Sequence, residues 1–317
     1  MTHDAVLTPA AETRAERFRR TEAALWEHHG LRPTERFIQL ENPRIRLRVL
    51  EVGTGTPVLM VHGTVGPGSW ASLIEAMGPG HRYVVLDRPG WGGSEPLDFT
   101  ASPYRRVAAD ILRGVLDALG IDRTVVIGGS IGDVWALSLA QLDPSRVEKV
   151  VLLGGGPMVA EARRPSFIRL LASPIGALIV RLPVNADRTR SILRDSGHGP
   201  SLDDGRIPDV FVDWRVSLSN DTKSMRHERA MVRSIVRGSG WQPGFLFDDA
   251  DLAAIESPAL MVHGTADPVG DVDIWRRFVR VMPDADLRVI DGAGHMPWFD
   301  EPQRVAGFVN RFVAVPG

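Results

Sequence analysis

The chain contains the segment Val125-Val126-Ile127-Gly128-Gly129-Ser130-Ile131-Gly132, in which an apolar run ends on a Gly-x-Ser-x-Gly turn. A helical pattern that includes Val134, Leu137 and Leu139 follows the turn. A sharp turn from strand to helix holds a serine hydroxyl where backbone N–H groups point at a reacting centre, and the flanking glycines leave room for the strained backbone. The segment therefore predicts that Ser130 is a nucleophile at the end of a buried strand.

A serine hydroxyl becomes a nucleophile through a base and an acid, which follow the serine in chains with this turn. The apolar run 259–262 ends shortly before Asp267, and the short strand pattern 287–290 leads into a Gly-rich loop that ends at His295. We therefore predict that His295 takes the proton of Ser130 and later returns it. Asp267 is expected to orient the imidazole and to stabilise the imidazolium.

A second Gly-rich loop lies upstream of the serine. The apolar run 58–61 leads into His62-Gly63-Thr64-Val65-Gly66-Pro67-Gly68, which is able to donate a backbone N–H to a developing oxyanion. The second donor is predicted to be the N–H of Ile131, the residue after the nucleophile.

Together these segments resemble the α/β-hydrolase fold family over roughly residues 35–315. The matching landmarks are the His62-Gly63 loop, Asp87-Arg88-Pro89-Gly90-Trp91-Gly92-Gly93-Ser94, the turn at Ser130, Asp267 and Gly294-His295. The resemblance implies Ser130 as nucleophile, Asp267 as acid and His295 as base. It also implies the N–H groups of Thr64 and Ile131 as oxyanion donors, with Val65 as the alternative to Thr64.

Short apolar runs alternate with helical patterns along most of the chain. This alternation predicts an α/β protein with a doubly wound, mostly parallel sheet and with its function at the carboxyl ends of the strands. The clearest helix is 103–119, with Ser102 as N-cap and Pro103 at the first position. The segment 44–49 alternates strictly and predicts an antiparallel strand with one solvated face. The continuously apolar runs, typical of strands covered on both faces, are 58–61, 83–86, 125–127, 150–153, 259–262 and 287–290.

The alternation breaks between about residues 157 and 247, a stretch far longer than an ordinary loop. It carries helical patterns at 166–182 and 209–237, and its position matches the helical cap of related hydrolases. The segment 167–182 is apolar, but two arginines and a proline interrupt it and it is shorter than the ~20 residues of a membrane span. We therefore expect it to form cap core or pocket wall.

The N-terminal part of the sequence predicts a separate helix. Residues 10–29 are rich in Ala, Glu and Arg and predict a helix that ends at Gly30, with Phe18, Leu25 and Trp26 as a narrow apolar edge. This edge would dock either on the body of the protein or on a partner chain. The predicted organisation is an N-terminal helical extension at 1–34, a hydrolase core at 35–156 and 248–317, and a helical cap at 157–247.

Composition excludes several classes of function. The 317 residues are 44% hydrophobic, enough to bury a full core. With 37 basic and 39 acidic residues, the net charge of −2 gives no basic excess for nucleic acid or an anionic membrane. The absence of cysteine excludes disulfides and thiolate chemistry. The first residues show no secretion signal, so we expect a cytoplasmic protein that binds a small-molecule substrate, with a homo-oligomer left open.

Five further residues carry specific expectations. His62 and His263 lie in Val-His-Gly turns and are expected to have structural roles. Trp135 is expected to pack between helix and sheet, whereas Trp298 follows His295 closely and is a candidate substrate contact. Asp133 departs from the Ser-x-Gly-Gly pattern usual in this family. A carboxylate in a first helical turn is favoured by the helix dipole, so we expect a structural role for it.

The sequence thus predicts a serine hydrolase, free of metal and cofactor, that acts through an acyl-enzyme on a small carboxylic ester, thioester or lactone. A serine at position 130 argues against haloalkane dehalogenases and epoxide hydrolases, whose nucleophile is a carboxylate. Two other activities stay open. The 62–68 loop resembles that of the hydrolases that cleave carbon–carbon bonds in ring-cleavage products, and Gly128-Gly129-Ser130 resembles the turn of proline aminopeptidases. The alternative outside enzymes is a non-catalytic small-molecule receptor on the same fold.

Overall fold

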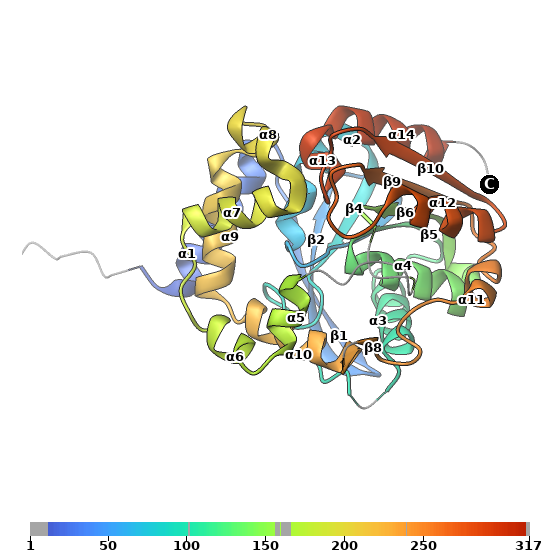
Figure 1. Cartoon of the computed structure of the whole chain (residues 1–317), viewed down its shortest axis with the longest axis horizontal. Helices are drawn as coiled ribbons and strands as arrows, with labels where there is room; N and C mark the ends of the chain where they lie inside the picture. Colours follow the sequence, from blue (N-terminus) through green and yellow to red (C-terminus); the bar gives the residue numbers. More distant parts are fainter. Residues whose placement is uncertain (1–11, 101, 156–158, 160–165, 239, 315–317) are drawn as a thin grey trace, which may run out of the picture.

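The apolar runs of the sequence form the strands of one eight-stranded sheet, in the order β1-β2-β4-β3-β5-β6-β9-β10 (Figure 1). The structure is a computed structural model that describes residues 12–100, 102–155, 159, 166–238 and 240–314. The strands are β1 Thr34–Glu41, β2 Arg44–Val52, β3 Gly55–Val61, β4 Gly80–Leu86, β5 Thr124–Gly129, β6 Val147–Leu153, β9 Ala259–Gly264 and β10 Ala285–Ile290. All pairs from β4 to β10 are parallel, and β2 is antiparallel to both of its neighbours. The predicted mostly parallel, doubly wound sheet is confirmed.

The strand order reverses between β3 and β5. The chain places β4 on one side of β3 and then returns to place β5 on the other side. In open α/β sheets, loops that leave the carboxyl ends of two such strands diverge and form the crevice in which ligands bind. The loop after β3 begins with His62, and β5 ends immediately before Ser130. The topology therefore brings the Gly-rich loop and Ser130 to the same crevice.

One strand differs from its prediction. The run 287–290 lies in β10, which is the last strand of the described sheet and pairs with β9 alone. Its side chains alternate between half-buried and exposed from Ala285 to Val289. The expectation of a strand covered on both faces is wrong here, because an edge strand with one packed face needs apolar residues only at alternate positions.

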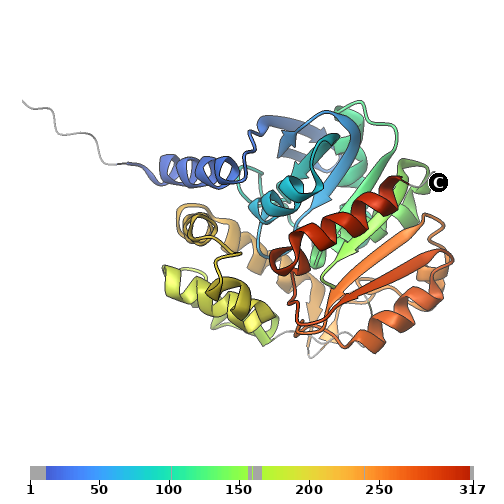
Figure 2. The same ribbon diagram turned by 90° about the horizontal axis from the view of Figure 1, so that it is seen from above.

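Helices cover both faces of the sheet. α3 Tyr104–Ala118 and α4 Ile131–Leu142 pack together on one face, and α2 Ala71–Met77 and α14 Pro302–Ala314 pack together on the other (Figure 2). Other short helical elements are η1 Pro67–Trp70, η2 Pro144–Arg146, α12 Val272–Val281 and α13 Pro297–Asp300, and α11 Asp249–Ala253 lies at the end of the connection between β6 and β9.

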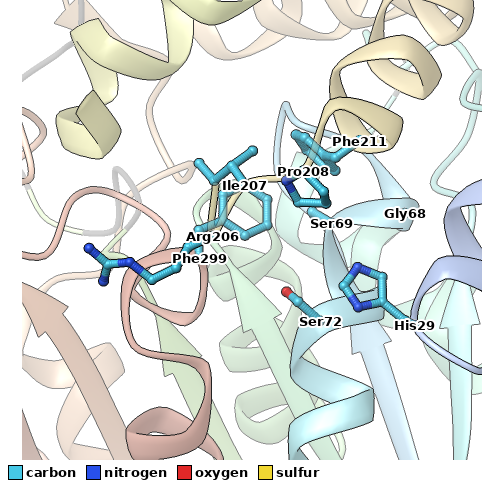
Figure 3. A pocket seen from close by; sticks show the side chains of 9 residues that line it. All are labelled: His29, Gly68, Ser69, Ser72, Arg206, Ile207, Pro208, Phe211 and Phe299. Carbon is cyan, nitrogen blue, oxygen red and sulfur yellow. The ribbon is translucent and has the colours of Figure 1, made fainter. Parts of the chain in front are cut away.

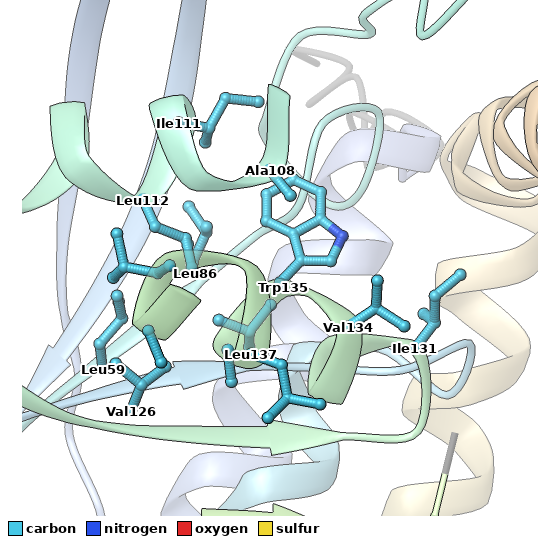
Figure 4. Packing of buried hydrophobic residues seen from close by; sticks show 14 of the residues in the cluster. Leu59, Leu86, Ala108, Ile111, Leu112, Val126, Ile131, Val134, Trp135 and Leu137 are labelled. Atoms are coloured by element: carbon cyan, nitrogen blue, oxygen red, sulfur yellow. The ribbon is translucent and has the colours of Figure 1, made fainter. Parts of the chain in front are cut away.

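The α4 helix anchors the first of these faces. Trp135 is fully buried among apolar side chains of β3, β4, α3 and α4 (Figure 4). Its indole N–H donates to the hydroxyl of Tyr104 at 2.7 Å, so the polar atom of the ring is satisfied inside the core. Trp135 is a core residue, as the sequence predicted.

The α3 helix begins one residue later than its prediction. Pro103 is the N-cap, with φ −56° and ψ 127°, and the first helical residue is Tyr104. The expectation of Ser102 as N-cap and Pro103 at the first position is therefore wrong by one residue. The proline ring fixes φ at a helical value but leaves ψ free, and here ψ is extended.

The long connection between β6 and β9 forms a helical group at one end of the sheet (Figures 1 and 2). We call residues 166–238 and 240–241 of this connection the cap segment. Both predicted helices are divided: the first at Ser173 to Ile175 around a proline, the second at Thr222-Lys223. The elements of the cap segment are α5 Ser166–Ala172, α6 Gly176–Ile179, α7 Ala186–Leu193, η3 Arg194–His198, α8 Gly199–Asp203, α9 Asp209–Asp221, α10 Ser224–Ile235, β7 Val236–Arg237 and β8 Gly240–Trp241.

The N-terminal helix docks on its own chain. α1 Arg14–His28 begins at Thr13, which forms a capping box with Glu16. Its apolar edge of Phe18, Leu25 and Trp26 is buried, and the helix packs against α9 of the cap segment (Figure 1). Of the two alternatives left open by the sequence, the structure has the edge on the body of the protein; residues 10–11 of the predicted helix lie outside the described residues.

Within the described residues, no helix combines the length and the apolar character needed to cross a bilayer.

Candidate active site

Ser130 occupies a strained turn between β5 and α4. Its φ is 56°, and among the described residues it is the one position with a side chain and a positive φ. The flanking glycines are required by close backbone contacts. A Cβ on Gly128 would lie 2.6 Å from the amide nitrogen of Asp133, and one on Gly132 would lie 2.0 Å from the carbonyl oxygen of Val61. Strain of this kind persists where the surrounding structure enforces it, and such positions cluster at reacting centres.

The three side chains predicted for the reacting centre lie in one line of hydrogen bonds. Nε2 of His295 lies 2.9 Å from Oγ of Ser130, and Nδ1 of His295 lies 2.9 Å from Oδ2 of Asp267. The other carboxylate oxygen of Asp267, Oδ1, accepts the N–H of Val269 at 2.8 Å, which fixes the carboxylate plane. With Nδ1–H donating to a carboxylate, Nε2 is free to accept the serine proton.

The Gly-rich loop after β3 passes directly beside the serine. A Cβ on Gly63 would lie 2.8 Å from Cβ and 3.5 Å from Oγ of Ser130, so only a glycine fits at this crossing. Thr64 is half-buried at the next position. Ile131 is the first residue of α4, where a helical N–H has no acceptor within its own helix. Thr64 thus follows the glycine that contacts Ser130, and Ile131 follows Ser130 itself; their role as oxyanion donors stays a prediction.

Two arginines, the buried Arg88 and the half-buried Arg215, donate to carbonyl groups of this loop. Nη2 of Arg88, which follows β4, donates to the carbonyl oxygen of Gly63 at 3.2 Å. Nη2 of Arg215, on α9, donates to the carbonyl oxygen of Thr64 at 3.2 Å. Arg88 is paired with Glu228 of α10 at 3.1 Å. Burial lowers the pKa of Arg215 to about 10, an effect that the negative charge of Glu228 opposes.

The sequence analysis did not find Arg215 or Glu228, although a signal for both is present. Arg215 lies on the same helical stripe as Phe211, Trp214 and Leu218, which are buried. A charged residue inside an apolar stripe has its head group among core residues and requires a partner there. Glu228 occupies the corresponding position on α10, on one stripe with the buried residues Met231, Val232 and Ile235.

The two histidines at strand ends have buried positions. Nδ1 of His62 lies 2.7 Å from the carbonyl oxygen of Gly63, and its Nε2 accepts the N–H of Arg88 at 3.2 Å. Burial, together with the positive charge of Arg88, holds the pKa of His62 well below its usual value. His263 is also buried, with Nδ1 3.5 Å from Oδ2 of Asp267, and burial lowers its pKa. Both positions support the structural roles expected for these histidines.

Trp298 packs behind the serine turn. It is 2% exposed, and its ring stacks on Trp70 with centroids 4.7 Å apart. Its indole N–H donates to the carbonyl oxygen of Ser69 at 2.7 Å. A Cβ on Gly129 would lie within 3.3 Å of both rings. The two tryptophans therefore pack directly against the backbone of the turn that carries Ser130. The expectation that Trp298 contacts substrate stays a prediction.

Asp133 is fully buried between α4 and β6. Its Oδ1 accepts the N–H of Leu153 at 3.3 Å, and the carbonyl oxygen of Leu153 accepts the N–H of Ser130 at 3.1 Å. The carboxylate therefore ties the first turn of α4 to the end of β6, which supports the expected structural role.

A small cavity is lined by residues of the cap segment and by residues outside it (Figure 3). Its volume of about 10 Å³ is close to the space that one water requires. It is lined by His29, Gly68, Ser69, Ser72, Arg206, Ile207, Pro208, Phe211 and Phe299, so Ser130 and His295 do not border it. In the part of the chain that the structure describes, no three His, Cys, Asp or Glu side chains gather as a metal site requires.

Comparison with known proteins identifies the family of the fold. The family model of the alpha/beta hydrolase fold matches residues 56–302. A 2-hydroxy-6-oxononadienedioate/2-hydroxy-6-oxononatrienedioate hydrolase from Burkholderia vietnamiensis is 29% identical over 294 residues, which cover 90% of this chain and 97% of the relative.

Two solved structures share the fold. The carboxylesterase CesB from Bacillus subtilis superposes with a TM-score of 0.75 at 17% identity, over 95% of this chain and 98% of the esterase. The 2-hydroxy-6-oxo-6-phenylhexa-2,4-dienoate hydrolase from Rhodococcus sp. strain RHA1 superposes with a TM-score of 0.72 at 20% identity, over 90% of this chain and all of the hydrolase. The matched residues, the sheet order and the serine turn together show that the chain belongs to the α/β-hydrolase fold family.

Proposed function

We propose that the protein is a serine hydrolase that breaks a carbon–carbon bond next to the ketone of a 2-hydroxy-6-oxo-dienoate. The observation that carries the hydrolase assignment is the line of hydrogen bonds from Ser130 through His295 to Asp267. The bond type rests on the relative from Burkholderia vietnamiensis, whose name describes hydrolysis of such a compound. This activity is one of the alternatives left open by the sequence, and the comparisons favour it over the ester substrate expected first.

The chemistry requires a proton shuttle and an oxyanion site. The substrate first moves its 2-hydroxyl proton to C5, which gives a 2,6-dioxo tautomer. Oγ of Ser130 then attacks the C6 carbonyl carbon while Nε2 of His295 takes the hydroxyl proton, and the N–H groups of Thr64 and Ile131 stabilise the oxyanion.

Collapse of this intermediate breaks the C5–C6 bond. The electron pair is delocalised into the 2-oxo group, and the resulting dienolate takes the proton from His295 and leaves as a 2-hydroxydienoate. His295 next activates a water, which releases the acyl group from Ser130 as a carboxylic acid. One water is consumed, and no other reactant is required.

A dienoate substrate is an anion, and Arg215 of α9, which donates to the loop beside Ser130, is a candidate partner for it. Arg215 donates to Thr64 and to Ser219 and, among the described residues, has no ion-pair partner of its own. Arg88, in contrast, is paired with Glu228. Arg215 is therefore the cation that we propose for the substrate carboxylate.

A carboxylic ester, thioester or lactone is the second candidate. The same three side chains form an acyl-enzyme from an ester without the tautomer step, because an alkoxide leaves more readily than a carbanion. The similarity in fold to a carboxylesterase is compatible with this chemistry.

Product analysis distinguishes these activities. The purified protein is incubated with 2-hydroxy-6-oxo-6-phenylhexa-2,4-dienoate, with p-nitrophenyl butyrate and with proline p-nitroanilide, and products are identified by mass spectrometry. We expect benzoate and a 2-hydroxydienoate from the first substrate, and none of either with Ser130→Ala. Ester cleavage without dienoate cleavage would assign an esterase, released proline would assign an aminopeptidase, and saturable binding without any product would assign a receptor.

A further inference from the structure

The backbone around His295 is held by side chains and carbonyls outside its own loop. The N–H of His295 donates to the carbonyl oxygen of Ser196 at 2.9 Å, and the N–H of Met296 donates to Nε2 of His198 at 3.1 Å. Ser196 and His198 belong to the cap segment. The amides of His295 and Met296 therefore both have acceptors in the cap segment. This segment is far away in sequence, with 98 positions between His198 and Met296.

His198 is itself fixed by a buried carboxylate. Nδ1 of His198 lies 2.8 Å from Oδ2 of Asp300, which also accepts the N–H of Gly294 at 2.8 Å. The hydroxyl of Ser201 donates to the other carboxylate oxygen. His198 is fully buried. Since Nε2 accepts the Met296 N–H, the proton of the ring lies on Nδ1 and faces Asp300, so the tautomer is determined by its two partners.

The backbone contacts between the two segments are close enough to need glycines on both sides. Gly197 has φ 92°, and a Cβ there would lie 2.6 Å from the carbonyl oxygen of Ala266 and 2.8 Å from Cα of Gly294. A Cβ on Gly294 would lie 2.6 Å from the carbonyl oxygen of Ser196. The turn 196–198 thus touches the loop of His295 and also the residue before Asp267.

We propose that His198 is a positioning residue for the reaction, and that the turn 196–198 of the cap segment aligns His295 between Ser130 and Asp267. This inference rests on the proposed hydrolase function of Ser130. Nε2 of His198 and the carbonyl oxygen of Ser196 accept the N–H groups of Met296 and His295, so the turn fixes the main chain at these two residues. The position of this main chain in turn determines where the imidazole of His295 lies. A misplacement of about 1 Å between reacting groups lowers a rate by as much as about 10²-fold. The cap segment is then part of the catalytic geometry.

Two substitutions of His198 separate the bond to Met296 from the bond to Asp300. In His198→Gln the side-chain oxygen reaches the position of Nε2 and still accepts the Met296 N–H. In His198→Asn the shorter amide still donates to Asp300 in place of Nδ1, but it does not reach Met296. Val309→Ala, which shortens a fully buried side chain of α14 that makes no hydrogen bond to the turn 196–198 or to His295, is the control for a loss of stability alone.

The readout is the second-order rate constant for labelling of Ser130 by a fluorophosphonate, since it needs no knowledge of the substrate. Where a substrate is found, kcat and KM are measured as well. We expect His198→Asn to slow labelling and to lower kcat by about 10- to 100-fold with KM within about threefold. His198→Gln is expected to stay within about fivefold of the wild type, and Val309→Ala to label at the wild-type rate.

Each result decides the proposal. Equal labelling of wild type and His198→Asn would overturn it, and so would equal losses in the Asn and Gln variants. Should His198→Asn not fold, Ser201→Ala takes its place, because it removes a bond to Asp300 and leaves His198 intact. A loss of about 3- to 10-fold supports the proposal and an unchanged rate contradicts it. Absence of labelling in the wild type would instead refute the hydrolase function, so the two failures are distinguishable.

Discussion

The guanidinium of Arg88 lies 3.1 Å from the carboxylate of Glu228, and this buried pair connects the cap segment to the loop beside the reacting serine. Arg88 also donates to the carbonyl oxygen of Gly63, which shares a peptide group with the N–H of Thr64. The same carboxylate oxygen of Glu228 accepts the indole N–H of Trp91 at 2.8 Å. A charge on α10 therefore balances the cation that orients a proposed oxyanion donor.

Removal of the Glu228 charge is expected to cost substantial stability. Glu228→Gln leaves the Arg88 cation buried without a counter-charge, so the free energy of unfolding should fall by about 3–5 kcal/mol. Urea unfolding of the two proteins measures the difference. The control is Asp273→Asn, which breaks the exposed pair with Arg276 and should cost about 0–1 kcal/mol. A fall in the free energy of unfolding as small as that of the control would show that burial does not strengthen the Arg88–Glu228 pair.

Asp267→Asn is expected to lower kcat by about 10³–10⁴ while the fold is kept. The structure gives the reason. Oδ1 of Asp267 accepts the Val269 N–H, so the amide oxygen of an asparagine takes that position and its NH₂ group faces Nδ1 of His295. The imidazole then carries its proton on Nε2 and does not accept the proton of Ser130.

Steady-state kinetics on whichever ester or dienoate is turned over, with circular dichroism to verify the fold, test the Asp267→Asn prediction. A loss below tenfold would transfer the role to another carboxylate.

Asp133→Asn tests whether the buried carboxylate after the serine turn is structural. We expect kcat/KM to change less than about tenfold, because a neutral amide keeps the shape of the side chain. The free energy of unfolding should fall by about 1–3 kcal/mol, since the substitution disturbs the bond that the buried Asp133 side chain accepts from the Leu153 N–H. Paired kinetics and thermal unfolding provide the measurement. A hundredfold loss of activity at unchanged stability would place Asp133 in the chemistry.

Glu22 gives the protein a pH dependence of stability in the acid range. Burial raises its pKa to about 7, although Arg48 opposes the shift; the nearby Asp87 adds to it. A carboxyl with a raised pKa binds its proton more tightly in the folded state, so this group lowers stability as the pH rises from 4.5, its ordinary value, to about 7.

The Glu22→Gln variant tests this linkage. Its unfolding free energy should decline less than that of the wild type between pH 5 and pH 7, as measured by urea unfolding at each pH. An equal decline in the two proteins would show that Glu22 is ionised throughout this range.

Much of the fold and of the site follows from local sequence signals. The strand ending on Gly128-Gly129-Ser130 was predictable because turn chemistry and an apolar run act over a few residues. Asp267 and His295 were predictable because each follows a strand pattern in the expected order. The start of α3 differed by one residue, since a proline at a helix start is compatible with both the N-cap and the first position.

The residues that link the cap segment to the core were not predicted. Arg215, Glu228 and His198 make contacts across 151, 140 and 98 positions of sequence, and those contacts depend on how the helices between β6 and β9 pack. Helical periodicity indicates which face of a helix is buried but not what it is buried against. A charge on an apolar stripe is the signal that such a contact exists, and it leaves the partner unspecified.

Fluorophosphonate labelling, followed by intact mass and peptide mapping, tests most directly whether Ser130 is the nucleophile. The activated hydroxyl and the flanking N–H groups together recognise tetrahedral phosphorus. The account predicts one adduct per chain, on Ser130, and none with Ser130→Ala. A folded protein without an adduct, or with an adduct on another residue, would contradict it.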